Sequence, residues 1–235
     1  MKYLNSLSDY LFVLVQHLRF DHHYTERKMN HKFTGPKIAL FLNGEPPRNL
    51  PECSTYQKIF VTDGAYHYLK KSNIRADVIS GDFDSANQTT FPEDITLIET
   101  PDQNFTDFEK ALKIIAQKRF LNVDIWGGSG KEQDHFLGNL STASKYKQNL
   151  SLIFYDNYHT YFFAETQSHL YGTKDKMVSL FPFPKAEGVV TKGLKYPLYG
   201  ESLEIHRRIG TRNISVSNTV EIVFTTGALV IFVER

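Results

Sequence analysis

The sequence predicts an α/β fold, with an N-terminal, mainly parallel α/β domain followed by a C-terminal all-β sandwich. From Lys37 to about Ala164, short β-rich apolar runs alternate with segments of helical pattern. This alternation is typical of parallel strands joined by crossover helices. After about Gln167, strand-like runs follow one another between glycine, proline or polar breaks, without a convincing helix. Such a succession is typical of a sandwich or jelly-roll domain.

The expected domains are residues 1–36 as an N-terminal extension, 37–168 as the α/β domain and 169–235 as the β domain. Residues 1–28 precede the first strand pattern, and both a family-specific extension and an upstream translation start remain open. The apolar stretch at residues 11–18 is shorter than the roughly 20 residues that span a bilayer. It also runs into charged residues rather than a cleavage site, so we expect neither a membrane helix nor a secretory signal.

Seven apolar runs are the expected strands of the α/β domain, and they are IALFL (38–42), KIFVT (58–62), DVIS (77–80), ITLIE (95–99), VDIW (123–126), SLIFY (151–155) and TYFFA (160–164). Helices are expected over 65–71, 106–118 and 135–147. The second helix has the clearest start, because Thr106 and Glu109 match a capping box just before an apolar pattern of helical spacing.

The strand-like runs of the β domain are MVSLFPF (177–183), GVVTKGL (188–194), SLEIHR (202–207), NISVS (213–217), EIVFTT (221–226) and ALVIFVE (228–234). They are separated by turns and show no internal repeat.

Charge and cysteine content indicate which kinds of molecule and which compartment to expect. The formal net charge is +1 and no long run of one sign occurs, so nothing indicates nucleic-acid binding, and small-molecule partners are expected. The single cysteine, Cys53, excludes an internal disulfide framework and fits a reducing compartment such as the cytoplasm.

Acidic residues and glycines follow the predicted strands of the α/β domain. They are Asp63-Gly64, the segment 81–85 (GDFDS), the segment 101–107 (PDQNFTD) and the segment 127–130 (GGSG). In an open parallel sheet, ligands bind beyond the carboxyl ends of the strands, so these residues are expected to converge. Clustered carboxylates repel one another unless a cation is present, and hard oxygen ligands suit Mg²⁺ shared with phosphates. The pattern therefore predicts a Mg²⁺–polyphosphate site, with glycine amides and a helix N-terminus near the phosphates.

Each feature also has a purely structural interpretation. An isolated Asp63-Gly64 pair is more often a turn than a ligand, and Asp107 alone equally suits the first turn of a helix. Asp82 and Asp84 flank Phe83 beyond a strand and are harder to explain as structural residues.

The glycine run is not a Walker A loop, because Glu132 stands where that motif has Ser or Thr and Ile125 stands at its first glycine. We expect His135 to be structural, and we expect no zinc site.

Four segments, in this order, resemble the thiamine pyrophosphokinase family, and the likeness runs from Lys37 to the C-terminus. They are DVISGDFDS, TPDQNFTDFEKAL, GGSGKEQDHFLGN, and TKGLKYPL followed by ISVSN. The resemblance implies an ATP-binding α/β domain, a thiamine-binding β-sandwich and a homodimer with active sites at the subunit interface. It also implies transfer of a diphosphate group from ATP to thiamine, with release of AMP and with Mg²⁺ as cofactor.

The resemblance also implies roles for individual residues. Those expected to act in catalysis are Asp82, Asp84, Asp107 and Asp134, the first three as metal ligands. Those expected to contact ATP are Asp63, Gly81, Asp82, Gln103, Thr106, Asp107, Gly128 and Lys131. Those expected to recognise thiamine are Asp134, Ser217 and Asn218, although the last two also suit a polar β-turn. Either Asp107 or Asp134 would orient the thiamine hydroxyl or accept its proton.

Two residues depart from the family pattern, namely Ala65 where a second glycine is common and Glu132 where arginine is common. Lys131 is the nearest cation that could compensate for the missing arginine. Two other functions remain as alternatives: a metal-dependent phosphohydrolase, and a thiamine or nucleotide sensor without catalysis.

Overall fold

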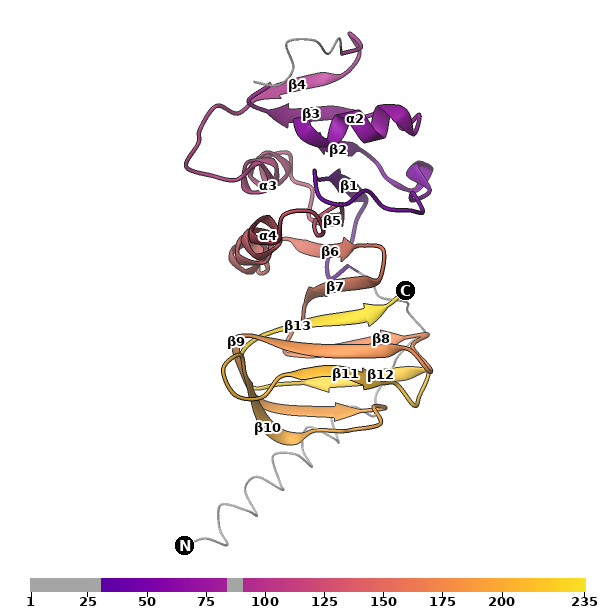
Figure 1. Ribbon diagram of the computed structural model, residues 1–235, viewed down its shortest axis with the longest axis vertical. Helices are drawn as coiled ribbons and strands as arrows, with labels where there is room; N and C mark the ends of the chain where they lie inside the picture. Colours follow the sequence, from indigo (N-terminus) through magenta and orange to yellow (C-terminus); the bar gives the residue numbers. More distant parts are fainter. Residues whose placement is uncertain (1–30, 84–90) are drawn as a thin grey trace, which may run out of the picture. The chain divides into compact units, whose positions relative to one another are not determined.

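The computed structural model describes residues 31–83 and 91–235 of the 235-residue chain. The described part divides into two compact units (Figure 1). The first comprises residues 31–163 with 234–235, and the second comprises residues 164–233. Within the described ranges, no helix is long and apolar enough to cross a membrane.

The first unit contains a parallel sheet with one antiparallel strand at its end. The strands are β1 (Lys37–Phe41), β2 (Ile59–Thr62), β3 (Val78–Gly81), β4 (Thr96–Glu99), β5 (Asn122–Trp126), β6 (Ser151–Tyr155) and β7 (His159–Phe163). Strands β1 to β6 pair in parallel in the order β4-β3-β2-β1-β5-β6, and β7 pairs antiparallel with β6. The α/β fold expected from the alternating pattern is confirmed.

The three expected helices are present, with small shifts at their ends. They are α2 (Asp63–Lys71), α3 (Asp107–Gln117) and α4 (Gln133–Tyr146), and a short 3-10 helix, η1 (Cys53–Thr55), precedes β2. Thr106 is the N-cap of α3, and its hydroxyl oxygen accepts a hydrogen bond from the Glu109 amide at 3.2 Å. The Glu109 carboxylate pairs instead with Lys145 of α4 at 3.0 Å, so only half of the expected capping box forms.

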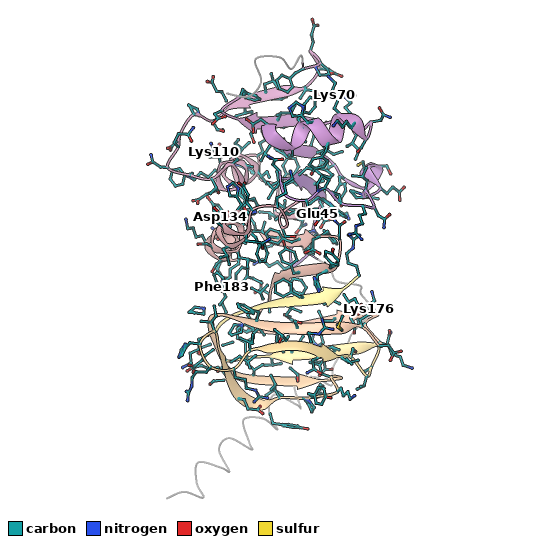
Figure 2. The ribbon with its side chains drawn as sticks, viewed as in Figure 1. Glu45, Lys70, Lys110, Asp134, Lys176 and Phe183 are labelled. Carbon is teal, nitrogen blue, oxygen red and sulfur yellow. The ribbon has the colours of Figure 1, made fainter. Side chains whose placement is uncertain are left out.

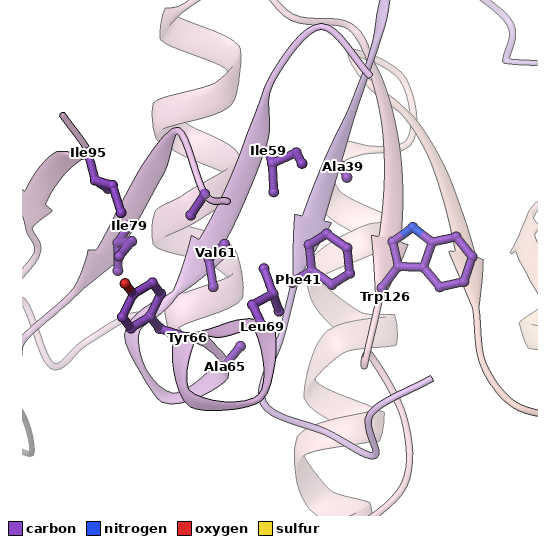
Figure 3. Packing of buried hydrophobic residues seen from close by; sticks show 11 residues of the cluster. Ala39, Phe41, Ile59, Val61, Ala65, Tyr66, Leu69, Ile79, Ile95 and Trp126 are labelled. Carbon is purple, nitrogen blue, oxygen red and sulfur yellow. The ribbon is translucent and has the colours of Figure 1, made fainter. Parts of the chain in front are cut away.

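Both faces of the inner strands β1, β2, β3 and β5 are buried, which explains why these strands are mostly apolar, whereas the edge strand β4 is largely exposed. On one face, Ala65 and Leu69 of α2 pack with Phe41, Val61 and other side chains of β1 to β3 (Figure 3). On the opposite face, Phe108 of α3 meets Phe154 of β6 edge to face, with 5.8 Å between ring centroids. Figure 1 draws α3 and α4 next to each other, and the Glu109–Lys145 ion pair joins them.

The second unit contains strands only, as the sequence predicted. The strands are β8 (Gln167–Tyr171), β9 (Met177–Lys192), β10 (Tyr199–Glu204), β11 (Gly210–Ile214), β12 (Thr219–Val223) and β13 (Thr226–Glu234). The long strand β9 pairs antiparallel with β10, β11, β12 and β13, and β12 also pairs with β8. Two differences from expectation are that runs 177–183 and 188–194 form this single strand, and that β8 was not anticipated.

A buried carboxylate links the start of the described chain to the sheet of the first unit. The Asp124 side chain of β5 is 2% exposed and lies 2.8 Å from His31 Nε2 and 3.0 Å from Lys37 Nζ. The Tyr56 hydroxyl also donates to it at 3.0 Å. Burial alone would raise the pKa of Asp124, but the hydrogen bond and charge of His31, together with Lys37, hold this pKa below its usual value.

Replacing Asp124 by Asn should destabilise the protein by roughly 3 kcal/mol at pH 7, because His31 and Lys37 lose their anionic partner. Since the pKa of Asp124 is lowered by folding, its contribution is present above the unfolded value of about 3.9 and is lost as the pH falls through the folded value. Urea unfolding of both proteins at pH 7 and below pH 4 measures this difference. As a control, Asp94→Asn removes an exposed ion pair with Arg75 and should cost well under about 1 kcal/mol.

Candidate active site

A pocket of about 360 Å³ lies in the first unit, at the carboxyl ends of its parallel strands. Its walls come from the segments that follow β1, β3, β4 and β5, from Thr62 at the end of β2, and from the first turns of α3 and α4. The sequence-predicted residues among those that line it are Asp82, Gln103, Thr106, Asp107, Gly128, Lys131 and Asp134. The chain order reverses between β1 and β5, and residues that follow both strands line the pocket. The pocket therefore lies where open α/β sheets bind their ligands.

The glycine-rich loop after β5 is held by its carbonyl groups. Each of the four consecutive carbonyl oxygens of residues 126–129 accepts a hydrogen bond of 2.8–2.9 Å, from the amides of Leu42, Gly44 and Glu45 and from the Asn139 side chain. Three of these donors belong to the loop after β1. The two loops are therefore joined by backbone hydrogen bonds that continue beyond the paired strands.

The amide groups of the same loop remain available. Across the part of the chain that the structure describes, the amides of residues 128–131 donate to no acceptor. Left-handed φ angles at Gly130 (+77°) and Lys131 (+53°) curve this segment before α4 begins at Gln133. A run of successive unpaired amides next to a helix N-terminus binds anions, and phosphate in particular.

Acidic residues form another part of the site. Asp63 accepts hydrogen bonds from the amides of Gly64 at 2.6 Å and Phe83 at 3.1 Å. Burial raises the pKa of Asp63; the two amide hydrogen bonds oppose this effect, whereas the carboxylates of Asp107 and Asp82 add to it. The mutual repulsion means that these three acids share one electrostatic environment, although Asp63 itself is not part of the pocket wall.

The donor chemistry of this acidic group suits Mg²⁺. The ion usually takes one or two carboxylates directly and completes its coordination with phosphate oxygens and water. Among residues 31–83 and 91–235, no three acidic, histidine or cysteine side chains are arranged as a complete metal site. Asp82 and Asp107 could therefore each supply a ligand to a metal shared with a polyphosphate. Asp84, the third predicted ligand, lies outside the described residues.

Two predicted phosphate contacts, Gln103 and Thr106, line the pocket. Gln103 donates from Nε2 to Asp82 Oδ2 at 3.1 Å, which orients that carboxylate. Thr106 lines the pocket as the N-cap of α3, directly before Asp107. Both residues are in the pocket wall because the segment between β4 and α3 closes one side of it.

Lys110 is a pocket residue that the sequence reasoning missed. Its ammonium lies 2.8 Å from Asp107 Oδ1 and donates to the Thr100 carbonyl at 2.9 Å, with 6% of the side chain exposed. Figure 2 labels this lysine on α3. A spacing of three residues on the helix, from Asp107 to Lys110, was the signal that could have found it.

The start of α4 supplies the remaining predicted residues. Asp134 lines the pocket, and its Oδ1 accepts the His135 amide at 3.0 Å. Lys131 and Glu132 also line the pocket, and the Glu132 side chain is 74% exposed and lies 3.7 Å from His135 Nε2. The residue at the family's arginine position thus carries a negative charge, and Lys131 is the cation next to it.

Gly81 is a predicted site residue, and its lack of a side chain leaves room for the Asp63 carboxylate. A Cβ atom at this position would lie 2.2 Å from both Cγ and Oδ2 of Asp63. Only glycine allows the Asp63 carboxylate to occupy this place against β3.

Ser217 and Asn218 belong to the second unit. The Ser217 hydroxyl oxygen accepts the Thr219 amide at 3.3 Å, and the Asn218 carbonyl accepts the Thr173 amide at 3.3 Å. The neighbouring Ser215 is fully buried, and its hydroxyl donates to the Ser217 carbonyl at 2.6 Å. The two predicted thiamine contacts therefore sit in an ordered polar turn before β12.

The fold and the pocket define a protein with an α/β unit that can hold a polyphosphate and a second, all-β unit. Comparison with known proteins gives the family. The sequence model of the thiamin pyrophosphokinase catalytic domain matches residues 52–154, and that of its vitamin B1 binding domain matches residues 165–229. The chain belongs to the thiamine pyrophosphokinase family, whose members are enzymes that transfer pyrophosphate from ATP to thiamine.

Individual relatives agree with this assignment. Thiamin pyrophosphokinase 1 of Caenorhabditis elegans is 27% identical over 197 aligned positions, covering 75% of this chain and 80% of the relative. The crystal structure of yeast thiamin pyrophosphokinase matches with a TM-score of 0.74 at 16% identity, covering 91% of this chain and 92% of the other. The Bacillus subtilis thiamine pyrophosphokinase structure matches with a TM-score of 0.73 at 20% identity, covering 85% and 99%. These structural matches show that the fold is shared.

A Gly81→Ala substitution should lower kcat/KM for thiamine diphosphate formation roughly 100-fold, because the new methyl group displaces Asp63 and breaks its bond to the Phe83 amide. Steady-state kinetics with ATP and thiamine measure the effect. Full activity in this variant would contradict a role for the Asp63 position.

A Lys110→Met substitution should reduce kcat/KM about tenfold, because Asp107 loses the buried cation that holds its carboxylate. The comparison is with Lys118→Met, which removes an exposed lysine at the C-terminal end of the same helix. Equal kinetics for the two variants would show that Lys110 has no influence on the site.

Proposed function

We propose that this chain catalyses magnesium-dependent transfer of a diphosphate group from ATP to the hydroxyl of thiamine, releasing AMP, and that the pocket of the first unit is where the transfer occurs. The observation that carries the proposal is that one pocket combines a row of unpaired backbone amides with carboxylates on its wall. The amides suit phosphate oxygens, and the carboxylates suit a cation that accompanies them.

Different residues of the pocket would position the phosphates and stabilise their charge. The amides of residues 128–131 and the N-terminus of α4 would bind phosphate oxygens, with Thr106 and Gln103 on the opposite segment. Asp82 and Asp107, with Asp84, would hold Mg²⁺. When bound, this ion neutralises charge that develops on the transferred phosphates. Donors fixed in advance by the fold need no rearrangement as this charge develops, which lowers the barrier.

A carboxylate is also needed near the attacking hydroxyl. Asp107 and Asp134 both line the pocket, and either could orient the hydroxyl or accept its proton. The hydroxyl oxygen would form a bond to the β-phosphorus of ATP while the bond from that phosphorus to the AMP oxygen breaks. Lys110 pairs with Asp107 at 2.8 Å, which favours Asp107 as a charge-stabilising ligand and leaves Asp134 for the hydroxyl.

The remaining roles follow from family membership. Ser217 and Asn218 would contribute to thiamine recognition, and the active form would be a homodimer in the cytoplasm. Light scattering at the assay concentration tests the dimer, because a fully active monomer would exclude it.

The reaction itself is tested by incubating the full chain with ATP, thiamine and Mg²⁺ and quantifying thiamine diphosphate and AMP. Equal amounts of both products are expected, with loss of both when Mg²⁺ is omitted or in an Asp82→Asn variant. Glu93→Gln, a change at an exposed acid outside the pocket wall, is the matched control and should keep full activity. Free phosphate without thiamine diphosphate would favour a phosphohydrolase, and ligand binding without turnover would favour a sensor.

A further inference from the structure

Lys131 is held at the pocket by a residue of a different loop. Its ammonium donates to the Asn43 carbonyl at 2.9 Å and to the Asn43 side-chain oxygen at 3.1 Å. Asn43 follows β1, is 88 positions away in the sequence, and lines the same pocket. One asparagine therefore fixes two of the three donors of this ammonium.

The hydrogen-bond partners of Lys131 are neutral. The other lysine in the pocket wall, Lys110, is paired with the Asp107 carboxylate. Both oxygens of Asn43 that contact Lys131 are neutral, and the described part of the chain gives Lys131 no contact with an acid. The result is a fixed positive charge at the end of the row of unpaired amides at residues 128–131.

The backbone around this contact is tightly constrained. Lys131 adopts a left-handed φ of +53°, which costs a non-glycine residue roughly 1 kcal/mol or more. A Cβ at Gly44 would lie 2.3 Å from the Gly127 carbonyl oxygen, so the loop after β1 approaches the glycine-rich loop closely. Such strain is kept where the surrounding structure fixes a conformation, and functional sites are where it gathers.

We propose that Asn43 is a positioning residue that holds the Lys131 ammonium against the phosphate chain of the nucleotide, so that the two loops form a phosphate grip that works without a metal ion. This inference rests on the proposed function for the identity of the nucleotide. A lysine on a flexible stem loses rotamer freedom when it binds an anion. Asn43 removes this freedom in advance while leaving the charge in place.

A structural role would be the simplest alternative, since Lys131 also ties one loop to the other. The two roles differ in how they respond to charge. Replacing Asn43 by Asp keeps an acceptor for the ammonium and so preserves a loop tie, but it neutralises the cation. A phosphate grip must therefore fail in this variant, whereas a loop tie must survive.

The test is calorimetric titration of the full chain with ATP in EDTA, so that no divalent cation contributes. Lys131→Gln should weaken binding about tenfold, since a charged hydrogen bond to phosphate is lost. Asn43→Asp should weaken it by the same factor, Asn43→Ala by a smaller one, and Lys131→Arg should retain most of the affinity. Lys70→Gln, a change in the last turn of α2 away from the pocket wall, should bind as the unchanged protein does (Figure 2).

Thermal unfolding of each variant separates the two roles. The proposal is overturned if Asn43→Asp binds metal-free ATP as the unchanged protein does, or if Lys131→Gln loses stability but not affinity. Turnover is measured in parallel: an unchanged protein that binds ATP but makes no thiamine diphosphate refutes the proposed function and leaves the grip intact. Normal turnover with affinity unaffected in every variant refutes the grip alone.

Discussion

The parallel pairing of β1 with β5 is the constraint on which the rest of the first unit depends. Their register runs from Lys37 opposite Asn122 to Phe41 opposite Trp126, and it continues into the loops that follow. The loop after β1 donates to the carbonyls of residues 126, 127 and 129, and the Asn139 side chain donates to that of residue 128, while the amides of residues 128–131 are left for a ligand. The backbone hydrogen bonds beyond the last strand residues thus also fix the conformation of the loops at the binding edge.

This edge of the sheet has a negatively charged region and a positively charged region. Burial raises the pKa of Asp63, and the nearby carboxylates of Asp107 and Asp82 add to this rise. Lys110 offsets part of this repulsion from within the wall, and the amide row with Lys131 forms a positive region. Under the proposed function, a nucleotide polyphosphate with its cation would satisfy both regions at once, which neither a neutral ligand nor a bare metal ion would do.

The first unit contains two kinds of carboxylate: one that stabilises the fold and several that belong to the pocket. Asp124 is an aspartate like the site residues, yet it contacts His31, Lys37 and Tyr56, and its side chain is 2% exposed. Its carboxylate is already satisfied by these partners and needs no ligand. The neighbouring side chains, and not the residue type, therefore decide whether a carboxylate holds the start of the described chain to the sheet or belongs to the pocket.

The sequence by itself determined the α/β and all-β parts, the three helices and the convergence of acids on one sheet edge, because these follow from local periodicity and from the position of residues after strands. It also indicated the family, since the four motifs are short runs of sequence that occur in the order typical of the family. Tertiary structure alone decided that Glu109 pairs with Lys145 instead of completing its capping box, and that runs 177–183 and 188–194 form one strand. It also decided that Asn43 holds Lys131 across 88 positions. Such contacts depend on the order in which strands assemble, and no local pattern in the chain records that order.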